Sequence, residues 1–122
     1  MTAAGEAHAP SWYADSVPAV ALRAPLSGDL KADVCVLGAG YTGLSAALTL
    51  AERGYRVVLL EAHRVGWGAS GRNGGQAIVG YGCEVDTLEH LVGAEDARTL
   101  FAFSRDGMRL LRDRIARHQI DC

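Results

Sequence analysis

Residues 33–61 read DVCVLGAGYTGLSAALTLAERGYRVVLLE, and this stretch carries the clearest structural pattern in the chain. It opens and closes with short apolar runs, 33–38 and 56–61, that are typical of strands buried on both faces in a parallel sheet. Between them, residues 42–53 carry apolar side chains at helical spacing, and Gly54 follows where a left-handed helix cap is expected. The stretch therefore predicts two parallel strands joined through one helix, a right-handed βαβ unit.

A glycine-rich turn lies between the first predicted strand and the helix. Residues 38–43 read GAGYTG, a G-x-G-x-x-G directly after a strand and at the start of a helix, as in dinucleotide-binding proteins. Gly38 permits the tight turn, Gly40 lets a pyrophosphate approach the backbone, and Gly43 lets the helix pack close to the sheet. The phosphates would meet backbone N–H groups and the positive end of the helix dipole. The residues expected to bind the pyrophosphate are Gly38, Ala39, Gly40, Tyr41, Thr42 and Gly43.

An acidic residue ends the second predicted strand. Glu61 follows Gly43 by 18 residues, near the spacing of about 20 at which dinucleotide-binding domains carry a ribose-binding acid. A carboxylate here accepts hydrogen bonds from the ribose hydroxyls and repels a 2′-phosphate, which disfavours NADP. The alternative interpretation is a plain βαβ turn with a surface glutamate, and the register of strand, turn, helix and acid argues against it. FAD and NAD both fit, because they share the ADP portion.

A second glycine-rich stretch follows soon after the second predicted strand. Residues 64–76 read RVGWGASGRNGGQ, and residues 66–82 hold seven of the 15 glycines in the chain. A simple NAD domain has no need of this stretch. A second run of glycines would let the backbone lie close to another part of a cofactor, either the pyrophosphate or an isoalloxazine ring. The alternative interpretation is a flexible surface loop. The second stretch therefore favours FAD over NAD.

Together, GAGYTGLSAALTLAERGYRVVLLEA and RVGWGASGRNGGQ strongly resemble the D-amino-acid-oxidase-like superfamily of FAD-dependent oxidoreductases. Within it, the chain looks most like the gamma-glutamylputrescine oxidase group from about residue 11 to the C-terminus. The resemblance implies a two-domain protein of several hundred residues, with FAD as cofactor. It also implies oxidation of a C–N bond in a small-molecule amine or amino acid, with hydride transfer to the flavin. The exact substrate, the catalytic residues and the final electron acceptor stay open.

The resemblance also implies cofactor contacts in the second stretch. Arg64 would lie near the adenosine or phosphate end of FAD, and residues 69–75 would line the pyrophosphate and the flavin. Arg72 is a candidate to touch the flavin ring. The FAD-binding residues implied for this stretch are Arg64, Gly68, Ala69, Ser70, Arg72, Asn73, Gly74 and Gly75.

The remaining segments give the expected organisation. Residues 1–30 contain three prolines that prevent a long helix, and they are expected to form an N-terminal arm held to a larger body by Trp12 and Tyr13. Residues 31–122 are expected to be the N-terminal part of an α/β, Rossmann-like FAD-binding domain. The rest of the enzyme, including further strands of the incomplete sheet, is expected beyond residue 122.

Helices are expected after the second glycine-rich stretch. Asp86 resembles the N-cap of a short helix, with Glu89 completing a capping box, and a long helix is expected over 95–120. Residues 77–79 are a weak candidate for a third strand. No acid–base pair is required in these segments, because the cofactor supplies the reactivity.

The composition limits the remaining classes of function. The net charge of −2 gives no general attraction to nucleic acid, and no segment approaches the roughly 20 apolar residues of a membrane span. Residues 1–10 lack the features of a secretory signal, and three separated cysteines suggest a reduced, cytoplasmic setting in which Cys35 is a core residue. The histidines lack metal-ligand spacing, so no metal is expected. The oligomeric state stays open. An NAD-binding dehydrogenase domain and a non-catalytic truncated fragment are the alternative functions.

Overall fold

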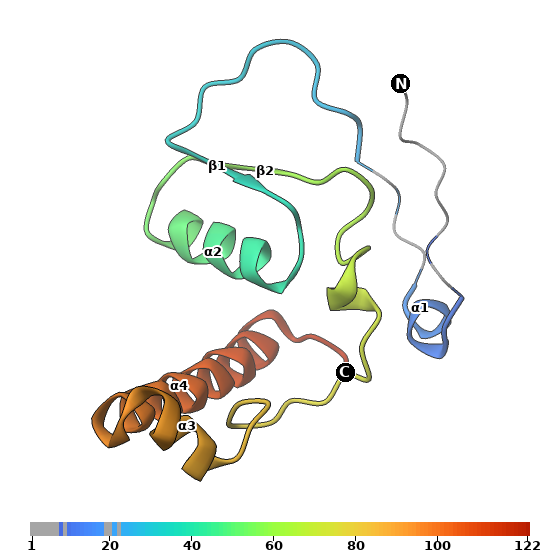
Figure 1. Ribbon diagram of the computed structural model, residues 1–122. Helices are drawn as coiled ribbons and strands as arrows, with labels where there is room; N and C mark the ends of the chain where they lie inside the picture. Colours follow the sequence, from blue (N-terminus) through green and yellow to red (C-terminus); the bar gives the residue numbers. More distant parts are fainter. Residues whose placement is uncertain (1–7, 9, 19–20, 22) are drawn as a thin grey trace. The chain divides into compact units, whose positions relative to one another are not determined.

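The computed structural model describes residues 8, 10–18, 21 and 23–122 (Figure 1). The chain divides into two compact units, Met1–Gly74 and Gly75–Cys122. The first unit contains helix α1 (Trp12–Ser16), strand β1 (Val34–Leu37), helix α2 (Tyr41–Glu52), strand β2 (Val57–Leu60) and the 3₁₀ turn η1 (Ala69–Gly71). The second contains helices α3 (Val85–Val92) and α4 (Ala94–His118).

The first unit is built on the predicted βαβ arrangement. Strands β1 and β2 pair in parallel, with Val34 opposite Val57 and Leu37 opposite Leu60. Helix α2 connects them and lies against one face of this two-stranded sheet (Figure 1). Gly54 has a φ of +87°, which confirms the left-handed cap after α2. The three predicted elements therefore form, with ends that differ by one residue from the predicted ones.

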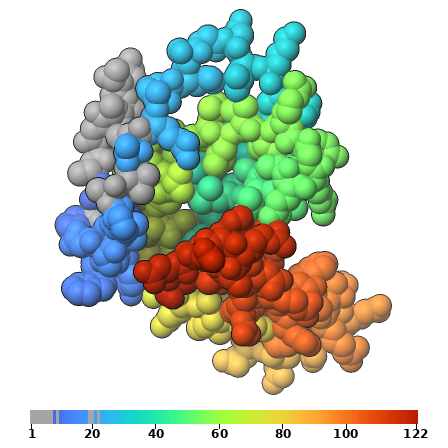
Figure 2. Space-filling view, turned by 180° about the vertical axis from the view of Figure 1, so that it is seen from behind, coloured from blue at the N-terminus to red at the C-terminus, as the bar shows by residue number. Residues whose placement is uncertain are grey.

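The second unit pairs two consecutive helices. Gly93, with a φ of +85°, ends α3 and begins α4, so the chain forms a short helix followed by a long one, as predicted. The long helix predicted over 95–120 is confirmed as Ala94–His118. Both helices are coloured orange to red in Figure 2, and Ala97 is the buried hydrophobic residue among those described in this unit.

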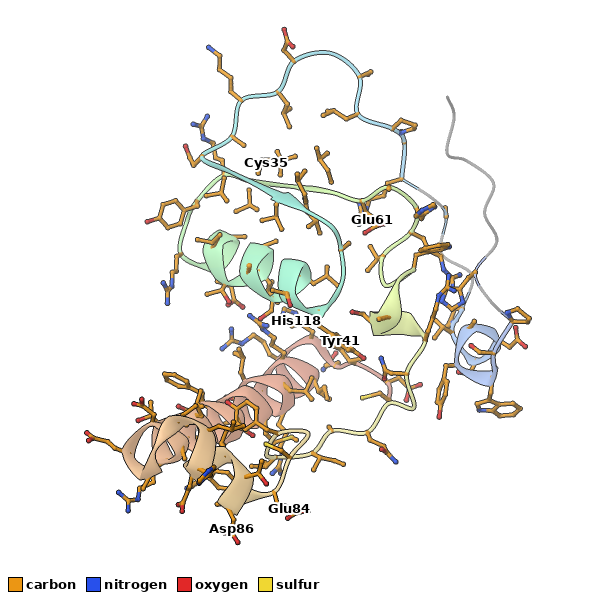
Figure 3. The ribbon with its side chains drawn as sticks, in the orientation of Figure 1. Cys35, Tyr41, Glu61, Glu84, Asp86 and His118 are labelled. Atoms are coloured by element: carbon orange, nitrogen blue, oxygen red, sulfur yellow. The ribbon has the colours of Figure 1, made fainter. Side chains whose placement is uncertain are left out.

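Two predictions for this second unit are wrong. Helix α3 starts at Val85, so Asp86 lies in its first turn instead of capping it (Figure 3). The N-cap is Glu84, because its extended backbone (φ −65°, ψ 154°) leads into the helix, and its side chain makes no capping bond. Asp86 still places a negative charge near the positive end of the helix dipole. Residues 77–79 form no strand, since no strand among the described residues runs beside them as a hydrogen-bonding partner.

The face of the sheet opposite α2 is open. Val34 and Val36 point toward α2 and are partly buried, whereas Cys35 and Leu37 alternate to the other side and are exposed. Figure 3 shows Cys35 on the side of the strand away from α2. The prediction that Cys35 is a core residue is therefore wrong for this chain. An apolar strand is buried on both faces only where a second layer covers it, and no described residue supplies that layer.

The described part of the N-terminal arm contains the short helix α1. Ser11 caps it, and its Oγ accepts a hydrogen bond from the N–H of Ala14 (3.1 Å). Trp12 is 81% exposed, so it does not anchor the arm to the part of the chain that the structure describes. Tyr13 does make such a contact, because its hydroxyl donates to the carbonyl of Gly74 (3.2 Å). Among the described residues, none of the helices combines the length and apolarity needed to cross a membrane.

Candidate dinucleotide-binding site

The first glycine-rich turn adopts the backbone that its glycines were predicted to allow. Gly38 leaves β1 with a φ of +92°, which other residues rarely adopt, and its N–H donates to the carbonyl of Leu60 (2.7 Å). Gly40 is the N-cap of α2. A Cβ on Gly43 would lie well inside 3.0 Å of the Gly38 carbonyl oxygen and 3.4 Å from Val36 Cγ1. Helix and strand are therefore packed as closely as glycine permits.

Glu61 lies just past the end of β2 (Figure 3). Its Oε2 accepts a hydrogen bond from the N–H of Ala39 in the first turn (2.7 Å), and its Oε1 accepts one from the N–H of His63 (3.0 Å). These bonds, that from Ala39 foremost, lower the pKa of Glu61. The carboxylate is therefore ionised at neutral pH, and a carboxylate has further lone pairs that can accept a ribose hydroxyl.

The second glycine-rich stretch lies against the first. The N–H of Gly66 donates to the carbonyl of Ala39 (2.9 Å), and the N–H of Tyr41 donates to Ser70 Oγ (3.0 Å). Asn73 Nδ2 donates to the Tyr41 hydroxyl (3.1 Å) and to two carbonyls of η1. Two segments that are distant in sequence thus form one surface around the N-terminus of α2 (Figure 1).

The second stretch repeats the backbone geometry of the first turn. Residues 66–71 read GWGASG, with the same G-x-G-x-x-G spacing. Gly66 has a φ of +72°, and Gly68 is the N-cap of η1. A Cβ on Gly71 would lie well inside 3.0 Å of the Gly66 carbonyl oxygen. The sequence analysis did not predict that Gly66 has a structural role in this second turn, although the G-x-G-x-x-G spacing indicates one.

Three side chains beyond β2 form a stack. The rings of His63 and Trp67 are stacked with centroids 4.0 Å apart and an interplanar angle of 19°. The guanidinium carbon of Arg72 lies 4.3 Å from the centroid of the Trp67 ring, and Arg72 Nε donates to the Trp67 carbonyl (2.9 Å). Sequence reasoning gave no role to His63 or Trp67, because contacts within an irregular loop leave no periodic pattern.

The other predicted site residues are more loosely connected. Arg64 contributes its carbonyl, which accepts from the N–H of Trp67 (3.0 Å), while its exposed guanidinium forms no ion pair within the described residues. Thr42 is exposed in the first turn of α2. Gly74 accepts the Tyr13 hydroxyl, and Gly75, with a φ of +68°, begins the second unit. The structure thus joins the two glycine-rich stretches and Glu61, but it does not tie the Arg64 side chain to them.

Comparison with known proteins identifies the family. Residues 33–122 match the family model described as FAD dependent oxidoreductase. The chain belongs to this family. The sequence resemblance to FAD-dependent oxidoreductases is therefore confirmed, and the βαβ unit and both glycine-rich stretches lie within the matched residues.

Several curated relatives align with nearly the whole chain. It is 49% identical over 115 residues to the gamma-glutamylputrescine oxidoreductase of Escherichia coli (strain K12). It is 45% and 41% identical to the probable oxidoreductases OrdL of Haemophilus influenzae and Rhizobium meliloti. The alignments cover 94%, 94% and 91% of this chain but 27%, 27% and 26% of the relatives. The chain thus spans about a quarter of their length. No solved structure matches.

Proposed function

We propose that this chain is the N-terminal, dinucleotide-binding portion of an FAD-dependent oxidoreductase that oxidises a C–N bond in a small-molecule amine or amino acid. Its βαβ unit would begin a Rossmann-like FAD-binding domain. The cofactor supplies the redox chemistry by accepting a hydride from the carbon that carries the nitrogen. The residues of this chain bind and orient that cofactor.

The first turn fits the pyrophosphate of FAD. The N–H groups of Thr42 and Gly43 lie in the first turn of α2, where no intrahelical carbonyl is available to them, at the positive end of the helix dipole. A side chain at Gly40 would crowd Ser70 Oγ, since a Cβ there would lie 3.0 Å from it. Ser70 accepts its hydrogen bond from Tyr41 and keeps its hydroxyl proton available for a phosphate oxygen.

Glu61 fits the adenosine ribose. Two backbone N–H groups fix its carboxylate beside the first turn, and the lowered pKa keeps it charged. Its remaining lone pairs would accept the ribose hydroxyls. The same negative charge would repel a 2′-phosphate, which supports FAD over an NADP-type cofactor.

The attachment of the second stretch to the first is the observation that carries the proposal. The Gly66–Ala39 and Tyr41–Ser70 hydrogen bonds bring a second run of bare backbone to the same surface. A cofactor that extends beyond its ADP portion, as FAD does, would contact both stretches. The residues that would bind its pyrophosphate and flavin parts are Arg64, Gly68, Ala69, Ser70, Arg72, Asn73, Gly74 and Gly75.

The proposed substrate class rests on the relatives. The Escherichia coli relative at 49% identity is named for gamma-glutamylputrescine, an amine-bearing molecule. The proposal is tested with the purified full-length protein in two steps. First, FAD and NAD are titrated separately, and tighter binding of NAD would rule out the proposed cofactor. Second, gamma-glutamylputrescine, D-amino acids and N-methylglycine are added without oxygen. Loss of the visible flavin absorbance with at least one of them is expected, whereas an unchanged spectrum with all three contradicts C–N oxidation.

A further inference from the structure

Trp67 holds the guanidinium of Arg72 at two points. The indole face attracts the cation at 4.3 Å, and the Trp67 carbonyl accepts a hydrogen bond from Arg72 Nε at 2.9 Å. The first contact sets the height of the guanidinium above the ring, and the second fixes its direction. Among the described residues, the two terminal nitrogens of Arg72 have no acceptor, and the side chain is exposed. Arg72 therefore presents an oriented cation with free donors.

The same stack is linked to Glu61. The His63 ring stacks on Trp67, and the His63 backbone N–H donates to Glu61 Oε1 (3.0 Å). A second connection runs through Gly66, the residue before Trp67. The N–H of Gly66 donates to the carbonyl of Ala39, and the N–H of Ala39 donates to Glu61 Oε2. Trp67 is thus connected by two short routes to the carboxylate proposed to bind the ribose. These routes associate Arg72 with the ADP half of the site.

We propose that Trp67 is a positioning residue that holds Arg72 at the ADP end of the cofactor, where its guanidinium binds a phosphate oxygen. This inference rests on the proposed function. It differs from the family resemblance, which makes Arg72 a candidate for contact with the flavin ring. The planar fork of N–H donors in a guanidinium matches phosphate oxygens, and the pyrophosphate carries the negative charge of the ADP portion.

The test compares ADP with adenosine as probes, because they differ in the phosphates alone. Binding of each is measured by calorimetry on the full-length protein and on R72Q, W67L, W67F and the double variant. We expect R72Q to weaken ADP roughly tenfold, the effect of losing one charge-assisted hydrogen bond. W67L should weaken ADP about two- to fivefold, because it removes the ring contact and keeps the backbone carbonyl that accepts from Arg72 Nε. Each variant should change adenosine binding less than about twofold. The double variant should bind ADP as R72Q does, since both changes remove one interaction.

Two further variants separate positioning from general damage. W67F keeps an aromatic face under the guanidinium, so it should recover most of the ADP affinity that W67L loses. W12L is the matched control, because Trp12 is the other tryptophan and is 81% exposed, and it should bind both probes as the wild type does.

Three outcomes would overturn the inference. An equal loss of ADP and adenosine affinity in W67L would show a merely structural role. Unchanged ADP binding in W67L would remove the positioning role. Unchanged ADP binding in R72Q, together with an altered absorption spectrum of bound FAD, would assign Arg72 to the ring. If the wild type bound neither ADP nor FAD, the proposed function itself would fail, which is a distinct result.

Discussion

Replacing Gly43 with alanine tests the close packing of α2 on β1. Helix propensity alone predicts that Gly43→Ala stabilises the protein, because alanine is favoured over glycine by up to about 1 kcal/mol in a helix. The geometry predicts the opposite. The new Cβ would fall well inside 3.0 Å of the Gly38 carbonyl oxygen, a backbone atom that no side-chain rotation can move.

The clash decides the expected sign. Overpacking costs about 1–3 kcal/mol even where side chains can adjust, and here α2 must shift away from β1. Because the clash is with a backbone atom, we expect the upper part of that range, about 2–3 kcal/mol, and the propensity gain of up to about 1 kcal/mol leaves a net loss of about 1–2 kcal/mol in the free energy of unfolding. The shift would also displace the backbone N–H groups in the first turn of α2, including that of Thr42. Because these groups are proposed to bind the pyrophosphate, FAD affinity should fall.

Gly107→Ala is the matched control. Gly107 is also a helical glycine, within α4, but apart from its chain neighbours and the adjacent helix backbone no described atom lies within 4 Å of the position its Cβ would take. This variant should raise the free energy of unfolding by about 0.5–1 kcal/mol and leave FAD affinity unchanged. Urea denaturation and FAD titration measure both variants in the full-length protein. A Gly43→Ala protein as stable as the wild type, with undiminished FAD binding, would refute the packing argument.

Three further predictions concern the carboxylate and the hydroxyl of the site. Glu61→Gln should lower FAD affinity roughly tenfold in a fluorescence titration, because an amide replaces one of the two acceptor oxygens and the charge is lost; equal affinity would exclude a ribose contact. The pKa of Glu61 is lowered from 4.5, so its contribution to stability is complete above about pH 4.5 and is lost as the pH falls through the folded-state pKa. The difference in melting temperature between wild type and Glu61→Gln should therefore shrink below that pH, and a constant difference would contradict the assignment. Ser70→Ala should weaken ADP binding a few-fold while leaving adenosine binding and the melting temperature nearly unchanged, since water can satisfy the exposed Tyr41 N–H; a large drop in melting temperature would show that Ser70 is mainly structural.

The βαβ unit was predictable because its signals are local. The β-branched run before Gly38 and the helical spacing after it each act within a few residues. The demands of the glycines are local as well: Gly38 makes the predicted tight turn out of β1, and Gly54 has the positive φ of the predicted left-handed cap. Family membership followed from the same residues together with the second glycine-rich stretch.

Burial and capping were less predictable. Cys35 has the neighbours of a core residue in the sequence, but its exposure depends on whether another layer covers that face of the sheet. Asp86 has a good capping side chain, yet the extended backbone at Glu84 sets the start of α3. In both cases the residue type indicates a preference, for burial at Cys35 and for capping at Asp86. The surrounding chain determines whether that preference is met.

The contacts that join the site required the folded structure. The second stretch was predicted to serve the same cofactor, but nothing in the sequence pairs Tyr41 with Ser70 or Gly66 with Ala39. No periodic pattern or motif in the sequence predicts the contact between Trp67 and Arg72. Such contacts depend on how an irregular loop folds back, which neither hydrophobic periodicity nor residue spacing describes.

In the proposed function, one cofactor occupies both glycine-rich stretches. Hydrogen–deuterium exchange of the full-length protein, measured with and without FAD, tests it directly. Amides of residues 38–43 and of residues 66–75 should both become protected when FAD is added. Protection of residues 38–43 alone would contradict it, because the second stretch would then be a loop that happens to lie against a dinucleotide site.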